Sequence, residues 1–128
     1  MKPVLTIDVE LDEIYEVNGT SGKASMLLFH GECDCENFKG RILPGAVDTQ
    51  KEPAGEPRLL SARYILEGKD SSGDNCRIFI ENNSVPNSEY TSPVIYTDSS
   101  NLKWLEDANL YGSITSKEGG VIINIYYK

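Results

Sequence analysis

The sequence predicts an all-β protein that forms a single closed or nearly closed antiparallel β-barrel of about eight to nine strands. Three observations predict this fold. Apolar and polar residues alternate in most segments, which is the period of a half-buried strand. Turn-forming residues recur at close spacing between those segments. The last segment, VIINIYY at 121–127, is apolar on both faces, and a closed sheet avoids exposing such a strand as an edge that would aggregate.

The first half of the chain divides into strands at its turn signals. Residues 4–11 (VLTIDVEL) alternate strictly, and an Asn-Gly turn within 16–23 leads to a second strand at 24–33. Pro44-Gly45 separates two further strands, FKGRIL and AVDTQ. We expect this Pro-Gly pair to bend a strand at a corner of the barrel, where glycines and bulges are used for turning.

The second half predicts a similar series of short elements. Residues 58–67 and 76–81 are expected strands, joined by a turn whose residues tolerate left-handed geometry. Residues 82–93 form the longest irregular stretch and are expected to be a loop. The remaining elements are expected in this order: a strand at 94–97, one short helix near Asn101–Ala108, a strand that ends near 115, and the strand 121–127.

Length and charge limit the classes of function. A chain of 128 residues fits one domain over 1–128. The net charge is −8, and no cluster of Lys or Arg interrupts this acidity, so we predict neither nucleic-acid binding nor attachment to an anionic membrane. Asp8 and Glu10 interrupt any signal peptide, and no segment approaches the ~18 apolar residues of a membrane helix. We therefore expect a cytoplasmic protein.

Several central motifs occur in an order that resembles a known family. They are FKGRILPGAVD (38–48), LLSARYIL (59–66), CRIFIENN (76–83), SPVIYT (92–97), KWL (103–105) and IINIYY (122–127). Over roughly residues 20 to 127 the chain is similar to small bacterial and fungal proteins known only as a domain of unknown function, with a calycin-like (lipocalin-like) barrel. Ala46 and Thr49 depart from that pattern, which usually has Gly and an aromatic residue there. The resemblance implies an architecture and no particular activity.

Three charged residues are candidate ligand-binding groups: Arg41, Asp48 and Arg63. If Arg63 points into the barrel, Asp48 is its natural partner, because a buried unpaired guanidinium is very costly. The Pro-Gly bend would aim Asp48 toward Arg63, with Arg41 near the rim. Such a pair would offer an anion- or carbonyl-binding floor. The alternative is that these residues are ordinary surface ions.

Three aromatic residues, Tyr90, Tyr96 and Trp104, lie in or after the long irregular stretch. At a barrel mouth such residues offer apolar contact area and a polar tip to a ligand. The alternative is that they cover and plug the end of the barrel.

His30 and the three cysteines predict no particular chemistry. His30 is the only histidine, and the chain has no Gly-x-Ser-x-Gly motif, so we expect an ordinary histidine in the barrel wall. Cys33, Cys35 and Cys76 are poorly spaced for zinc. We predict no bound metal, no cofactor and no disulfide needed for folding.

The leading functional hypothesis is that the barrel binds a small molecule in its cavity. A first alternative is a cofactor-free enzyme for proton transfer or lyase chemistry, with Asp48 as general base and Arg63 stabilising an oxyanion. A second alternative is an interaction module with a filled barrel, which acts through its surface or as a homo-oligomer. The volume of the cavity would separate this module from the other two.

Overall fold

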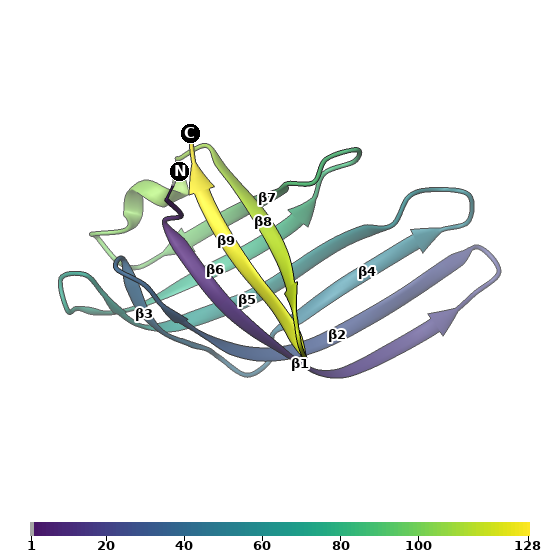
Figure 1. Cartoon of the computed structure of the whole chain (residues 1–128), viewed down its shortest axis with the longest axis horizontal. Helices are drawn as coiled ribbons and strands as arrows, with labels where there is room; N and C mark the ends of the chain where they lie inside the picture. The colour runs from purple at the N-terminus through teal and green to yellow at the C-terminus, as the bar shows by residue number, and fades with distance from the viewer. Residues whose placement is uncertain (1) are drawn as a thin grey trace.

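The computed structural model describes residues 2–128, and it is built almost entirely of antiparallel strands (Figure 1). The elements are β1 (Leu5–Asn18), β2 (Gly22–Asp34), β3 (Phe38–Ile42), β4 (Val47–Pro53), β5 (Leu59–Asp70), β6 (Asn75–Ser84), β7 (Thr91–Thr97), the short 3-10 helix η1 (Lys103–Glu106), β8 (Leu110–Lys117) and β9 (Gly120–Tyr127). No helix within residues 2–128 is long and apolar enough to cross a membrane.

The sheet closes on itself, because β1 pairs with β2 on one side and with β9 on the other. Strands β3 and β4 occupy successive parts of one position between β2 and β5. The result is a closed eight-stranded antiparallel barrel plus one extra strand. The predicted fold class is confirmed.

The chain bends at Pro44-Gly45, as the sequence predicts. Strand β3 ends at Ile42 and β4 begins at Val47, and Gly45 has a φ of 105°, which favours glycine. Two backbone hydrogen bonds hold the bend to its neighbours: Leu43 N donates to Ile65 O (2.8 Å), and Phe29 N donates to Ala46 O (3.3 Å). The bend therefore breaks one strand without opening the barrel there.

Two stretches contain more strand than expected. Strand β1 continues to Asn18 through an irregularity between Leu11 and Ile14. Half of the expected loop 82–93 is strand, since β6 runs to Ser84 and β7 begins at Thr91. Polar composition suggests a loop for these residues, but their backbone groups pair across the β6–β7 ladder. The short helix η1 lies within the predicted range 101–108.

The two ends of the barrel differ. At one end, here called the closed end, the segment before η1 packs on the β5–β6 turn: Ser99 Oγ donates to Asp70 Oδ2 (2.7 Å) and Asn101 Nδ2 donates to Ser71 Oγ (2.7 Å). The opposite end, here called the open end, carries the β1–β2, β4–β5 and β6–β7 turns. The core includes Leu102 just before η1 and Leu105 within it, together with buried apolar residues of all the strands except β4 and β8.

Neighbouring strands of the barrel share few backbone pairs in two places. Strand β9 pairs with β1 only as far as Glu10, opposite Gly120, whereas β1 continues to Asn18. Strands β7 and β8 share a single bridge, between Thr91 and Gly112. Both places border the open end.

Candidate functional site on the inner face of the open end

Four polar side chains share the inner face of β4–β7. Asp48 lies opposite Ala62, and Ala62 lies opposite Asn82. Residues directly opposite one another point to the same side of a sheet, so Asp48 and Asn82 face inward with buried Ala62. Tyr64 follows Ala62 by two positions on that face, and Thr91 lies opposite Ser84, two positions after Asn82. We call Asp48, Tyr64, Asn82 and Thr91 the inner polar wall.

Each of these four side chains has a buried polar atom without a hydrogen-bond partner among the described residues. The atoms are Asp48 Oδ1, Tyr64 OH, Asn82 Oδ1 and Thr91 Oγ1. Three of the side chains belong to almost fully buried residues, with exposed fractions of 3% for Tyr64, 1% for Asn82 and 7% for Thr91. An unsatisfied buried polar group costs about 1–3 kcal/mol, and native proteins contain few of them. Four in one part of the barrel indicate a site built for polar contact.

Burial acts on the pKa of both ionisable members of the wall, Asp48 and Tyr64. Burial raises the pKa of Asp48. Two weaker effects lower it: the hydrogen bond that Gln50 Nε2 donates to Asp48 Oδ2 (2.9 Å) and the positive charge of Arg58. Burial also raises the pKa of Tyr64. The Tyr64 ring meets Phe29 edge to face, with centroids 5.4 Å apart. The Tyr64 hydroxyl is therefore carried by a buried ring that packs on an apolar neighbour.

Gly112 keeps space next to this wall. It lies opposite Thr91 at the single β7–β8 bridge. A Cβ atom at position 112 would lie 2.4 Å from Thr91 Oγ1 and 3.5 Å from Asn82 Oδ1. The first distance is shorter than carbon and oxygen tolerate, so glycine is required for Thr91 to keep its place.

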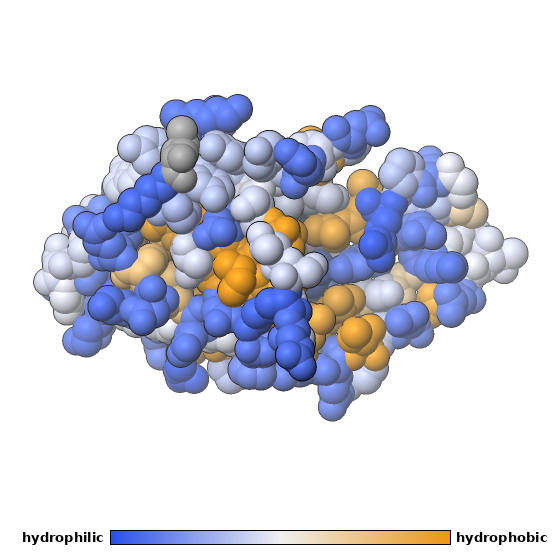
Figure 2. Space-filling model, in the orientation of Figure 1, coloured by the Kyte–Doolittle hydropathy of each residue, from blue (hydrophilic) through white to orange (hydrophobic). Residues whose placement is uncertain are grey.

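Two apolar side chains of β1 near the open end are partly exposed. Leu11 is 39% exposed and Ile14 is 50% exposed. Both lie on the face that carries buried Val9, because they pair with Phe29 and Leu27 on the inner side of β2. Figure 2 shows apolar side chains gathered in the middle of the viewed face, bordered by hydrophilic ones. Because Leu27 also lies opposite Asp48, Leu11 and Ile14 share the inner face with the polar wall.

The predicted pair of Asp48 and Arg63 is wrong. Asp48 lies opposite Ala62, so Arg63 points to the other side of the sheet. There its Nε lies 3.1 Å from Glu81 Oε1, and its side chain is 60% exposed. Arg63 is the surface ion of the alternative interpretation, whereas Asp48 does face inward after the Pro-Gly bend.

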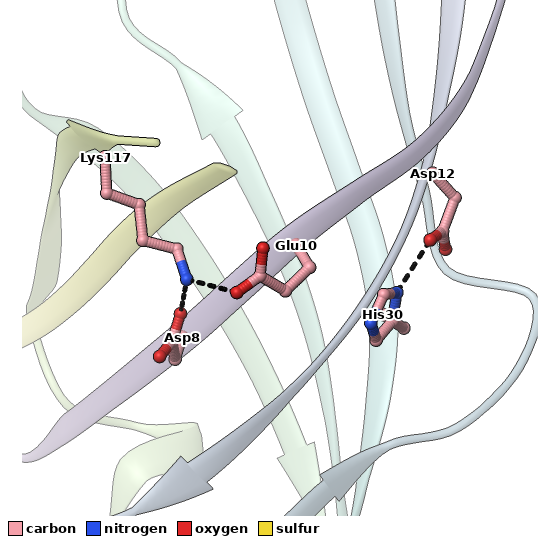
Figure 3. A network of polar contacts seen from close by, with 5 residues as sticks. All are labelled: Asp8, Glu10, Asp12, His30 and Lys117. Carbon is pink, nitrogen blue, oxygen red and sulfur yellow. Dashed lines mark hydrogen bonds and ion pairs between the residues drawn. The ribbon is translucent and has the colours of Figure 1, made fainter. Parts of the chain in front are cut away.

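Arg41 also lies on the outer face, with Nη2 3.8 Å from Glu67 Oε1. It lines an outer pocket of about 610 Å³ together with His30 and Asp12. His30 Nδ1 lies 2.7 Å from Asp12 Oδ1 (Figure 3). His30 is thus an outward-facing wall residue with its own acidic neighbour.

A second polar network lies beside it on the outer face (Figure 3). Lys117 Nζ contacts Asp8 Oδ1 and donates to Glu10 Oε1 (2.6 Å). These groups satisfy one another, unlike those of the inner polar wall.

The three candidate aromatic residues lie at separate places, and Tyr90 lines a pocket together with Thr91 of the inner polar wall. Each packs on another ring: Tyr90 on Tyr111 (5.3 Å between centroids), Tyr96 on Phe79 (5.9 Å) and Trp104 on Tyr127 (5.1 Å). No single ligand could touch all three and Asp48. Their role in binding stays a prediction.

Sequence reasoning missed Tyr64, Asn82 and Thr91. The sequence could have predicted that Tyr64 faces inward, because Ala62 and Leu66, on the same face of β5, are apolar. Asn82 continues the alternation of Ile78 and Ile80 on β6, which places it inside. No comparable signal marks Thr91, which lay within the expected loop.

The described part of the chain contains no cluster of potential metal ligands. Within residues 2–128 no group of three or more His, Cys, Asp or Glu side chains could hold a metal ion. Cys33, Cys35 and Cys76 are free thiols.

Comparisons with known proteins agree with the barrel. No family model matches the chain. A UPF0311 protein of Clostridium acetobutylicum is 28% identical over 123 positions, which cover 79% of this chain and 75% of the relative. The crystal structure of a protein of unknown function from the same organism aligns with a TM-score of 0.81 at 22% identity, covering 98% and 94% of the two chains. A β-barrel-like protein of Acinetobacter baumannii aligns with a TM-score of 0.74 at 20% identity, covering 98% and 93%. The chain is therefore similar to an uncharacterised family of barrels.

Proposed function

We propose that the barrel binds a small molecule at its open end, held by the inner polar wall. One observation carries this proposal: four buried polar atoms, on Asp48, Tyr64, Asn82 and Thr91, have no partner in the described chain. A ligand that supplies those hydrogen bonds would recover part of the desolvation cost of each atom. Binding pockets commonly combine apolar walls with a few such polar groups.

The chemistry of the wall selects the ligand class. Asn82 Oδ1 accepts a hydrogen bond, and a tyrosine or threonine hydroxyl can donate or accept. A ligand with hydroxyl groups matches this set, because a hydroxyl also both donates and accepts. The exposed side chains Leu11 and Ile14 on the approach favour a ligand with an apolar body. A hydroxylated aromatic molecule has both properties.

Charge disfavours an anionic ligand. No Lys or Arg shares the inner face of β4–β7, all of whose residues are described. The whole chain carries −8. Arg58, just before β5, is the cation whose charge acts on Asp48, so a carboxylate or phosphate would have to compete with Asp48 for it. This favours a neutral ligand class, and the anion-binding role foreseen for Arg63 has no support on this face.

The experiment compares neutral phenols with matched molecules that lack the hydroxyl. Phenol, catechol and toluene are titrated into 15N-labelled protein, and amide shifts of β4–β7 are followed by NMR. We expect catechol to bind more tightly than toluene. Tyr64→Phe and Asn82→Leu should each weaken catechol binding by about fivefold or more, the value of roughly one hydrogen bond.

Tyr96→Phe is the matched control, because Tyr96 lies on the outer face and is exposed. It should leave binding unchanged. Equal binding of toluene and catechol, or equal effects of the two tyrosine changes, would exclude the inner polar wall as the binding site.

A second candidate function, proton transfer, has one observation in its favour. Burial raises the pKa of Asp48 above its ordinary value, which suits a general base or acid. In this version the Tyr64 hydroxyl or the Thr91 hydroxyl would stabilise an oxyanion, since Arg63 lies outside. Hydrogen exchange at the carbon next to the carbonyl of a neutral cyclic ketone, followed in deuterated water, tests it. Asp48→Asn should abolish any catalysed exchange while leaving phenol binding within about threefold.

A further inference from the structure

Two thiols lie together at the closed end of the barrel. Cys33 Sγ and Cys35 Sγ are 3.7 Å apart, although one residue separates them in the chain. Cys33 belongs to β2 and is buried, whereas Cys35 follows the strand and is half-buried. The two sulfurs are therefore in contact, and only one of them can be reached from solvent.

The backbone around the β2–β3 turn holds both sulfurs in this arrangement. Cys35 N donates to Phe38 O (3.0 Å), which closes the turn. Both thiols also approach the Phe38 carbonyl oxygen, Cys35 Sγ at 3.4 Å and Cys33 Sγ at 3.7 Å. Asn37 Nδ2 donates to Val4 O (2.9 Å), so the turn is fixed to the segment that leads into β1. The proximity of the sulfurs does not depend on a flexible loop.

The two thiols are chemically unequal. The hydrogen bond from Cys33 lowers the pKa of Cys35 to about 5, and burial opposes this effect. The pKa of Cys33 is raised, first by its contact with Cys35 and then by burial. Cys35 is thus the more acidic of the two thiols. A half-buried, more acidic thiol beside a buried one is the arrangement of an attacking and a resolving cysteine.

We propose that Cys33 and Cys35 form a thiol–disulfide exchange site that reacts with small-molecule disulfides. The Cys35 thiolate attacks one sulfur of the small disulfide, a mixed disulfide forms on Cys35, and a small thiolate leaves. Cys33 Sγ then attacks Cys35 Sγ and releases a second small thiolate. The departing thiolates take up the proton of Cys33 and one from solvent. The protein loses two electrons to the small disulfide, which becomes two thiols.

This proposal rests on other groups than the binding proposed for the open end, although the charge of Cys33 also acts on Tyr64. Cys33 and Cys35 lie beside Phe38 and Val4, whereas the inner polar wall lies on β4–β7. Neither proposal depends on the other.

The test uses oxidised glutathione and intact-mass spectrometry on the full chain, quenched at low pH. The wild type should lose the mass of two hydrogens and retain no glutathione, and peptide mapping should find Cys33 joined to Cys35. Cys33→Ser should trap one glutathione on Cys35, because the resolving thiol is gone. Cys35→Ser should slow the reaction by about tenfold or more. Cys76→Ser is the matched control, since Cys76 lies on β6, and should behave as the wild type.

A second measurement on the unaltered chain guards against variants that fail to fold. The alkylation rate of Cys35 by iodoacetamide should change by less than about threefold between about pH 6.5 and about pH 8.5, whereas an ordinary thiol accelerates by about fiftyfold over this range. A stable glutathione adduct on wild-type Cys35, an ordinary pH profile, or modification of Cys35 no faster than of Cys76 would each overturn the proposal.

Discussion

Two inward-facing carboxylates mark the two ends of the barrel. Asp70, at the closed end, is fully engaged: Ser99 Oγ donates to its Oδ2 (2.7 Å), and the backbone N–H groups of Ser72 and Asp74 donate to its Oδ1 (2.9 and 3.2 Å). The Ser99 hydrogen bond is the largest of the causes that hold the pKa of Asp70 below its ordinary value. Asp48, toward the open end, has one hydrogen bond, from Gln50, and burial raises its pKa.

The two ends differ in whether the chain satisfies its own buried polar groups. The closed end ties its polar groups to its own backbone and packs η1 over an apolar core. The open end keeps polar atoms that its own chain does not satisfy. A protein selected only for stability would replace such atoms, because unsatisfied buried groups cost free energy. Within residues 2–128 such atoms occur at one end alone, and this is the observation on which we base the proposed binding site.

The largest expected effect contrasts apolar packing at the two ends. Leu66→Ala, at a fully buried position of β5, should lower the free energy of unfolding by about 2–5 kcal/mol. Ile14→Ala, at a half-exposed position near the open end, should cost less than about 1 kcal/mol. Urea unfolding of both variants provides the measurement. Equal losses would mean that the open end is packed as tightly as the closed end.

Gly112→Ala probes the space beside the inner polar wall. The new Cβ would meet Thr91 Oγ1 at 2.4 Å, so the variant should lose about 1–3 kcal/mol of stability. Thr91→Ala removes the clashing oxygen. The double variant should therefore be more stable than the sum of the single effects, with a coupling of about 1 kcal/mol in a double-mutant cycle. Additive effects would show that the clash is relieved elsewhere.

Asp48→Asn and Asp70→Asn should change stability in opposite directions. The pKa of Asp48 is raised in the folded state, so its charge opposes folding above that pKa; Asp48→Asn should add about 0.5–1 kcal/mol at neutral pH. This gain should fade as pH falls through the folded pKa of Asp48. The pKa of Asp70 is lowered, so Asp70→Asn should destabilise at neutral pH, and this loss should shrink as pH falls through the folded pKa of Asp70. Thermal unfolding of both variants against pH measures the two trends.

Arg63→Ala should have the smallest effect. Its ion pair with Glu81 is exposed, so removing it should cost less than about 1 kcal/mol. A double-mutant cycle between Asp48 and Arg63 should give a coupling near zero, because the two side chains lie on opposite faces of the sheet. A coupling of several kcal/mol would restore the buried pair that the sequence suggested.

Local patterns were sufficient to predict the fold. The strict alternation of residues 4–11 and the apolar segment 121–127 correctly predict two strands, which pair with each other in the structure, and Pro44-Gly45 correctly predicts the bend. These features depend on the period of a strand and on the geometry of two residues, both of which are local. The β6–β7 strand extension was missed because ladder pairing outweighs the turn propensity of Asn, Ser and Pro.

The site could be predicted only in part. The hypothesis of an inward pair is right for Asp48 and wrong for Arg63, which is the surface ion of the alternative interpretation. The relative register of β4 and β5 decides which residue lies opposite Asp48, and a shift by one residue exchanges the faces. Register arises from tertiary pairing, so it cannot be read from either strand alone. Unsatisfied atoms such as Asn82 Oδ1 become visible only when every neighbouring group has been placed.

The single bridge between β7 and β8 has a consequence for motion. Every other neighbouring pair of strands shares at least the three residue pairs seen between β2 and β3. A wall joined at one point can part along that line without disturbing the remaining ladders, so local opening should need less free energy there than elsewhere. Amide hydrogens of β8 on the side of β7 should exchange with solvent sooner than those of β5 and β6. Thr91 forms that single bridge, so local opening of the barrel would occur next to the residues that we propose hold its ligand.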